Sequence, residues 1–194
     1  MKTVGLTGGI GSGKSTLMQW FQKQGVPCFE SDAVGRKLLD TDLREAVSEA
    51  FGVELYLQTG SLDRNALAEK VFANPAALAK LNQIVHPAVA IVFEDFKKQH
   101  ANAPFVINEA AILFETGGYK NYDVIILVTA PKSDRIERII NRDGSTKAEV
   151  IKRMKNQWED ERKRKLADYV IENSTIKSAQ KQAAQILEKL DDAL

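Results

Sequence analysis

The chain has 194 residues and a mass of 21.5 kDa, the size of one α/β domain with insertions rather than two independent domains. Its 27 Lys and Arg residues nearly balance 26 Asp and Glu, and a net charge of +1 argues against nucleic acid or an anionic membrane as the main partner. A single cysteine and two histidines exclude a disulfide framework and a plausible zinc cluster. The apolar runs are short and the N-terminus lacks a leader pattern, so we expect a cytoplasmic protein with no membrane-spanning segment.

The N-terminal residues predict a strand, a glycine-rich loop, a helix and a second strand. Lys2–Thr7 is a short apolar run bounded by glycine, typical of a buried strand. Lys14–Gln24 has the apolar spacing of a helix, and Gly25 suits the left-handed conformation that ends one. Val26–Glu30 is the second predicted strand. This order of elements is a βαβ unit.

The middle of the chain is predicted to be helical. Its segments combine polar or proline helix starts with apolar residues at helical spacing, whereas Gly52–Gly60 is expected to be a loop. Within the last of these segments, we expect Pro87 to restrain His86 away from helical geometry. The expected helices are Asp32–Leu39, Asp42–Phe51, Asp63–Phe72 and Pro75–Gln99.

Strands and helices alternate in the second half. The unbroken Val-Ile-Ile-Leu-Val run in Tyr122–Thr129 predicts a parallel strand that is buried on both faces. Residues 131–165 carry a local net charge of +5 and are expected to form two helices, broken at residues 143–145. Together the elements predict an α/β fold with a doubly wound parallel sheet of about five strands. The remaining expected elements are the strands Phe105–Asn108 and Asp168–Glu172 and the helix Ser178–Leu190.

Residues 8–15, Gly-Gly-Ile-Gly-Ser-Gly-Lys-Ser, fit the phosphate-loop pattern in full. A strand is predicted before them and a helix after them, which is the context in which backbone N–H groups and a helix N-terminus cradle phosphate. Lys14 is expected at the β- and γ-phosphates, and the Ser15 hydroxyl is expected to be a ligand of Mg²⁺. The sequence therefore predicts a nucleoside triphosphate site. The residues expected to bind it are Gly11, Ser12, Gly13, Lys14, Ser15 and Thr16.

A regulatory GTPase fits the sequence poorly. Asp32-Ala-Val-Gly matches its Asp-x-x-Gly magnesium motif, but it begins only 18 residues after Lys14, which leaves little room for a switch segment. Residues 131–134, Pro-Lys-Ser-Asp, have proline where the base-reading motif needs asparagine. A small-molecule kinase instead needs an acidic group at a strand end to orient or deprotonate an acceptor hydroxyl. Asp32 meets that need, and a helix N-cap is its alternative role.

A kinase also needs positive charge that closes over the transferring phosphoryl group. Arg135, Arg138 and Arg142 recur at helical spacing and predict one basic helix face, toward which Arg153 of the next helix is expected to point. We expect residues 131–165 to be a lid that excludes water, and we call them the lid segment. Arg142, beside the Asp143-Gly break, is the first candidate for catalysis, and Arg138 is expected to bind the nucleotide with it, while a solvated charged face is the plainer alternative.

Residues 5–15, Gly-Leu-Thr-Gly-Gly-Ile-Gly-Ser-Gly-Lys-Ser, resemble the opening of the dephospho-CoA kinases, and the likeness continues along the chain. It includes the acid pair of Glu30 and Asp32, His86-Pro87 and residues 113–115, Leu-Phe-Glu. The resemblance implies a P-loop kinase that transfers the γ-phosphoryl group of ATP to the ribose 3′-hydroxyl of dephospho-CoA, with Mg²⁺. The other matching residues are Arg138, Arg142, Arg153, Gln157, Ala167, Asp168 and Asn173.

The resemblance also implies roles for parts of the chain. Asp32 is the expected general base, and a helical insertion at about 32–103 is expected to bind the acceptor, with His86 and Leu113 on the acceptor side. The core of this single domain is expected at 1–31, 104–130 and 166–194, with the lid at 131–165. The chain departs from the family by lacking a proline in residues 108–112, and this places Glu109 at a strand end, where it is expected to hold a Mg²⁺-bound water. A nucleoside monophosphate kinase and a non-catalytic nucleotide-binding module are the alternatives.

Overall fold

The computed structural model describes residues 1–72 and 74–192. The chain forms two compact units. Residues 1–29 and 100–194 make the first, which is called the sheet unit here because it holds most of the sheet. Residues 30–99 make the second, which is called the helical unit.

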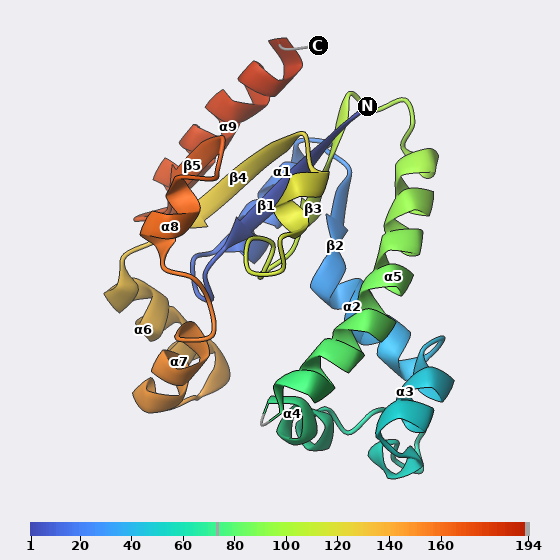
Figure 1. The fold of residues 1–194 in the computed structure, drawn as a ribbon. Helices are drawn as coiled ribbons and strands as arrows, with labels where there is room; N and C mark the ends of the chain where they lie inside the picture. The colour runs from blue at the N-terminus through green and yellow to red at the C-terminus, as the bar shows by residue number, and fades with distance from the viewer. Residues whose placement is uncertain (73, 193–194) are drawn as a thin grey trace. The chain divides into compact units, whose positions relative to one another are not determined.

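The sheet has five strands in the order β2-β3-β1-β4-β5, shown in Figure 1. β1 pairs in parallel with both β3 and β4, and β4 pairs in parallel with β5. Consecutive strands are therefore joined by crossovers, and the predicted α/β fold with a doubly wound parallel sheet is confirmed. The strands are β1 (Lys2–Gly8), β2 (Cys28–Glu30), β3 (Phe105–Glu109), β4 (Val124–Thr129) and β5 (Tyr169–Glu172).

Alternation along the strands divides the core of the sheet unit between two faces. Val4 and Leu6 belong to a buried cluster with side chains of α1 (Lys14–Lys23) and α9 (Ile176–Asp192), which cover one face. Ile125 and Leu127 of β4 point to the opposite face of the sheet and form a second cluster with the segment after β3. The members of this second cluster are Leu113, Phe114, Ile125 and Leu127.

The helical unit has its own apolar core, and the sequence predicted its helices to within a few residues at each end. Its buried cluster includes Leu55 of a short 3-10 turn, Val53–Leu55, in the segment expected to be a loop. The Tyr56 hydroxyl donates to the Leu39 carbonyl at 2.7 Å and fixes this segment to the first helix of the unit. The helices are α2 (Ser31–Asp40), α3 (Arg44–Phe51), α4 (Arg64–Phe72) and α5 (Pro75–Gln99).

The long helix α5 corrects one expectation and bears on a second. It continues through Pro87, so the prediction that this proline keeps His86 out of helical geometry is wrong. A proline removes one backbone donor and kinks a helix, and a helix of 25 residues retains many other hydrogen bonds. An 18-residue window of α5 has a mean hydropathy of 1.4, so by length and composition alone this helix is able to cross a membrane. One such helix is weak evidence for a membrane, because core helices of soluble proteins meet the same criterion.

The lid segment contains three helices, not the two that the sequence predicted. Gly144 ends α6 (Lys132–Asp143) in the left-handed region, at φ +66°, as expected for a helix stop. Thr146 and Glu149 form a reciprocal capping box that starts α7 (Lys147–Met154). The additional helix is α8 (Asp160–Arg164), whose five residues are all charged and give no apolar periodicity to detect.

Asp123 fastens the start of β1 and its substitution tests the stability of the sheet unit. Its Oδ2 accepts from the Thr3 N–H at 2.6 Å and from the Thr3 hydroxyl at 2.8 Å, and these hydrogen bonds lower the pKa of Asp123. We expect Asp123→Asn to lower the free energy of unfolding by about 1 kcal/mol at pH 7. Denaturant unfolding measures this loss, with Asp191→Asn as an exposed control.

Wild type and Asp123→Asn also test how the free energy of unfolding depends on pH. Because the pKa of Asp123 is lowered in the folded state, its carboxylate stabilises the fold above the unfolded-state pKa. That contribution is lost as the pH falls through the folded-state pKa, where the carboxyl group becomes protonated. The difference between wild type and Asp123→Asn is therefore expected to shrink toward zero in acid. A difference that stays constant with pH contradicts this account.

Candidate active site

The phosphate loop joins β1 to α1 in the sheet unit. The Ser12 N–H donates to the Gly9 carbonyl at 3.1 Å, which closes a turn within the loop. Gly13 precedes the first residue of α1 at φ +96°, and a Cβ placed there would collide with the side-chain amide of Asn173. Position 13 therefore needs glycine both for its backbone conformation and for its close neighbour.

Lys14, the first residue of α1, directs its ammonium group back along the loop. Its Nζ donates to the Gly8 carbonyl at 3.0 Å and lies 3.5 Å from Oε1 of Glu109. Both residues are buried, with exposed fractions of 9% and 8%. β3 pairs with β1 so that Glu109 lies opposite Leu6, and this register brings the carboxylate to the loop. The sequence placed Glu109 at a strand end but did not reveal its ion pair with Lys14.

The hydroxyl groups of the loop differ in exposure. The Ser12 side chain is completely buried, and its Oγ has no hydrogen-bond partner among the described residues. A buried hydroxyl without a partner is rare in proteins, and here it lies in a loop that is built to meet an external polar group. Ser15 and Thr16 are exposed on the first turn of α1. All three hydroxyls thus stand at the N-terminus of a helix, where anions bind.

Arg138 and Asn173 hold the loop from outside. The Arg138 guanidinium donates from Nη1 to the Gly11 carbonyl at 3.4 Å and from Nη2 to the Asn173 carbonyl at 3.0 Å. The Asn173 side-chain amide donates to the Ser12 carbonyl at 2.8 Å. Arg138, expected to contact the nucleotide, therefore contacts the backbone of the phosphate loop in this structure. Asn173 is among the residues that match the family, but the sequence predicted no role for it.

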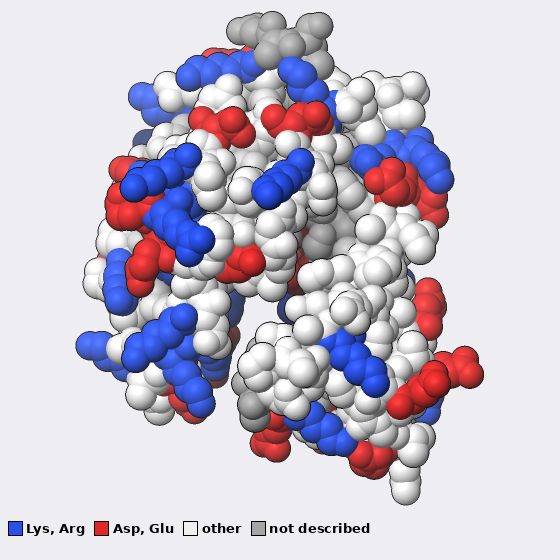
Figure 2. Space-filling view, in the orientation of Figure 1, with Lys and Arg blue, Asp and Glu red and all other residues white. Residues whose placement is uncertain are grey.

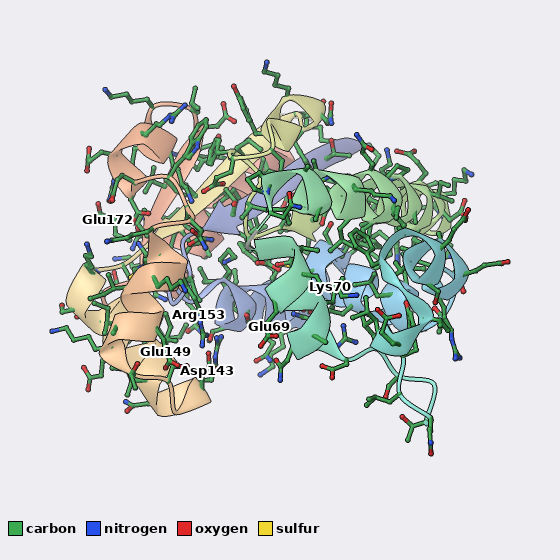
Figure 3. The ribbon with its side chains drawn as sticks, turned by 60° about the horizontal axis from the view of Figure 1, so that its bottom comes forward. Glu69, Lys70, Asp143, Glu149, Arg153 and Glu172 are labelled. Atoms are coloured by element: carbon green, nitrogen blue, oxygen red, sulfur yellow. The ribbon has the colours of Figure 1, made fainter. Side chains whose placement is uncertain are left out.

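Arg142 is paired with a neighbouring carboxylate. Its side chain is 63% exposed, and its Nε donates to Oδ1 of the adjacent Asp143 at 2.6 Å. Arg153 binds the other oxygen of Asp143 at 3.0 Å and the Ser145 hydroxyl at 2.7 Å. Figure 3 shows Asp143 and Arg153 close together, beside Glu149 on the lid segment. Asp143 thus holds both side chains at the end of α6, and their predicted approach to the phosphate loop stays a prediction.

The contacts among Asp143, Arg142 and Arg153 also shift pKa values. Hydrogen bonding and attraction from Arg142, with a smaller contribution from Arg153, lower the pKa of Asp143. The same hydrogen bond raises the pKa of Arg142. Lys and Arg side chains gather on the face of the lid segment that Figure 2 shows, with acidic side chains between them. The surface of the lid segment is thus basic, and at Asp143 two of its arginines are paired within the segment.

The other predicted site residues lie in different surroundings. Asp32 is exposed in the first turn of α2, but the N-cap of that helix is Glu30, so the N-cap alternative for Asp32 is wrong. His86 is exposed on α5. Leu113 is 5% exposed within the second cluster of the sheet unit, so its contacts are those of a core residue. Its predicted place on the acceptor side stays a prediction, as does that of His86.

Comparison with known proteins identifies the family. The family model described as Dephospho-CoA kinase matches residues 2–178. A curated relative, the dephospho-CoA kinase of Salinibacter ruber, is 38% identical over 191 residues, which span 96% of each chain. A crystal structure from Thermus thermophilus has a TM-score of 0.89 and 33% identity, covering 97% of this chain and 96% of that one. The dephospho-CoA kinase structure from Campylobacter jejuni has a TM-score of 0.71 and 25% identity, covering 98% of both. The chain belongs to the dephospho-CoA kinase family.

Proposed function

We propose that the protein transfers the γ-phosphoryl group of ATP to the 3′-hydroxyl of the ribose of dephospho-CoA, the final step of coenzyme A biosynthesis. The observation that carries this proposal is the family match over residues 2–178, which includes an intact phosphate loop on a parallel sheet. The proposed substrates are the small molecules ATP and dephospho-CoA. Nucleic acid and membranes are not part of the proposal, and the cytoplasm, where ATP is available, is the proposed location.

The proposed reaction is a direct in-line transfer with no phosphoenzyme. ATP is held on residues 11–16, where Lys14 places its charge at the β- and γ-phosphates. Asp32 accepts the proton of the acceptor hydroxyl as that oxygen attacks phosphorus. Asp32 is exposed and follows β2 by two residues, which supports this role because open α/β sheets bind ligands beyond the carboxyl ends of their strands. The phosphoryl group forms no covalent bond with the protein during this transfer.

The proposed lid role rests on Arg138 and Arg142. Arg138 already contacts the phosphate loop, which supports its proposed place beside the nucleotide. Arg142 is the more exposed of the two, and its contacts with Asp143 are at the surface, where an ion pair contributes little stability. Exchange of this ion pair for a phosphate therefore costs little. Closure of the lid segment also excludes water, which competes with the acceptor for the phosphoryl group.

The residues present fit a magnesium ion. Mg²⁺ prefers oxygen ligands and is commonly held by one or two protein groups together with substrate phosphates. The exposed Ser15 hydroxyl and the Glu109 carboxylate beside Lys14 are oxygen donors at the phosphate loop. We propose Ser15 as a ligand and Glu109 as the group that holds a metal-bound water. When bound, the ion neutralises charge on the β- and γ-phosphates.

Glu109→Gln tests the proposed metal role. The variant keeps the shape of the side chain but loses the negative charge, so the Mg²⁺ concentration that gives half-maximal activity is expected to rise about tenfold. The measurement is a Mg²⁺ titration at saturating ATP and acceptor. Glu69→Gln, on α4, is a control with the same chemical change in the helical unit. An unchanged metal dependence in Glu109→Gln removes Glu109 from the metal site.

A coupled ADP-release assay tests the function itself. It is run with ATP, Mg²⁺ and dephospho-CoA, beside AMP, CMP and a control without acceptor. ADP release that depends on dephospho-CoA, with coenzyme A identified as the product, is the expected result. Release that depends on a nucleoside monophosphate instead overturns the acceptor but keeps the kinase mechanism. Nucleotide binding without release in any arm favours a non-catalytic binding module.

A further inference from the structure

Ile10 of the phosphate loop is held at both of its backbone polar groups by side chains of the lid segment. Its N–H donates to Oε1 of Gln157 at 2.8 Å. Its carbonyl accepts from Nε of Arg135 at 2.9 Å. The N–H and the carbonyl belong to two successive peptide units, so these two side chains fix two consecutive peptides of the loop.

Arg135 is itself held in place and is not a freely moving cation. Its side chain is 10% exposed, and Nη1 binds Oδ2 of Asp160 at 3.1 Å. The guanidinium lies directly against Gly9, where an added Cβ would collide with Nη2. Arg135 therefore joins the phosphate loop to the first residue of α8, and the glycine at position 9 makes room for this approach.

Gln157 has a second contact of its own. Its Nε2 donates to the Ala111 carbonyl at 3.4 Å, in the segment that follows β3. The next residue, Trp158, donates its backbone N–H to Oε1 of Glu115 at 2.8 Å, and the buried Lys163 ammonium lies 2.7 Å from the same oxygen. These contacts hold the lid segment against the residues after β3. They therefore fix the backbone from which the Gln157 side chain reaches Ile10.

The direction of these hydrogen bonds matters for phosphate binding. In a trans peptide the carbonyl and the N–H point in opposite directions. With its carbonyl turned toward Arg135, Ile10 leaves the following N–H, that of Gly11, directed away from the guanidinium. Oriented backbone N–H groups are what such a loop offers to phosphate, and orientation before binding lowers the cost of binding.

We propose that Gln157 and Arg135 are positioning residues that fix the peptides on both sides of Ile10 and so set the N–H groups of the phosphate loop for nucleotide binding. Neither residue touches the reacting atoms in this role. Arg135 thereby acts on the loop backbone and not as a phosphate-clamping lid arginine. The proposal rests on the proposed function only in requiring that the loop binds a nucleoside triphosphate.

Gln157→Leu is the main test, because leucine fills similar space but offers no acceptor to Ile10. We expect the dissociation constant for ATP, measured without acceptor, to rise about tenfold, which is the loss of about one hydrogen bond. In the kinase assay the KM for ATP is expected to rise by a similar factor, while the KM for dephospho-CoA stays unchanged. Gln22→Leu, on the exposed side of α1, makes the same chemical change away from the loop and is the control.

Amide exchange provides a readout that a general loss of packing does not mimic. Followed by NMR, the Ile10 N–H is expected to exchange at least tenfold faster in Gln157→Leu, while strand amides of β1 keep their protection. Gln157→Asn keeps the amide group but shortens the side chain. We expect the same rise in the ATP dissociation constant and in Ile10 exchange from this variant, which replaces the leucine variant as the test if that one fails to fold. Unchanged ATP affinity and unchanged Ile10 exchange in a folded variant overturn the proposal. Both measurements omit the acceptor, so they are independent of whether dephospho-CoA is the substrate.

Discussion

Asp32→Asn is expected to lower turnover by about 10²–10⁴-fold while nucleotide affinity stays within about twofold, because a positioned general base contributes that factor. Asparagine has nearly the same shape as aspartate but accepts a proton poorly. Asp32 is exposed in the first turn of α2 and is not the N-cap of that helix, so its replacement has little effect on folding. The measurements are kcat for the dephospho-CoA reaction and the ATP dissociation constant.

Asp42→Asn is the matched control for this variant. Asp42 is also exposed in the helical unit, close to the start of α3, and the same substitution there removes one negative charge from that unit. We expect Asp42→Asn to keep full activity. An Asp32→Asn enzyme with wild-type turnover would exclude Asp32 as the base. A variant that loses nucleotide affinity in proportion to turnover would assign Asp32 to ground-state binding instead.

The sequence predicted best those features that depend on near neighbours in the chain. The strand, loop and helix around residues 8–15 follow from a local pattern of apolar residues and glycines. The helix Pro75–Gln99 was predicted with its exact ends, because its apolar spacing is long and regular. α8 was missed since charged residues alone define it. Pro87 misled the prediction because the rule for the residue before proline is a local preference, and a helix of 25 residues keeps many other hydrogen bonds.

The contacts that shape the site were harder to predict because they join distant parts of the chain. The ion pair of Lys14 and Glu109 follows from β3 lying next to β1, and strand order cannot be read from either strand. Gln157 and Ile10 are separated by 147 positions. Helical spacing placed Arg138 and Arg142 on one face, but it carried no information on the hydrogen bond that Arg142 donates to Asp143. Rotamers of long exposed side chains depend on such immediate partners.

Lys14→Met is expected to have two separable effects, because the ammonium group of Lys14 has two negative neighbours in the catalytic cycle. Toward ATP it is a preorganised positive charge, and its loss is expected to lower kcat/KM by about 10²–10³-fold. Toward the protein it lies 3.5 Å from the buried Glu109 carboxylate. Removing that cation is expected to lower the free energy of unfolding by about 2 kcal/mol in the absence of nucleotide.

The double variant Lys14→Met with Glu109→Gln separates these effects. Glutamine removes the charge that the methionine variant leaves buried, so most of the lost stability is expected to return. Activity is not expected to return, because neither neutral side chain supplies positive charge to the phosphates. Denaturant unfolding and the kinase assay on the wild type, both single variants and the double variant form a complete cycle. Additive losses of stability in this cycle would show that Lys14 and Glu109 do not interact. Recovery of kcat/KM in the double variant would show that the charge of Lys14 acts on Glu109 and not on ATP.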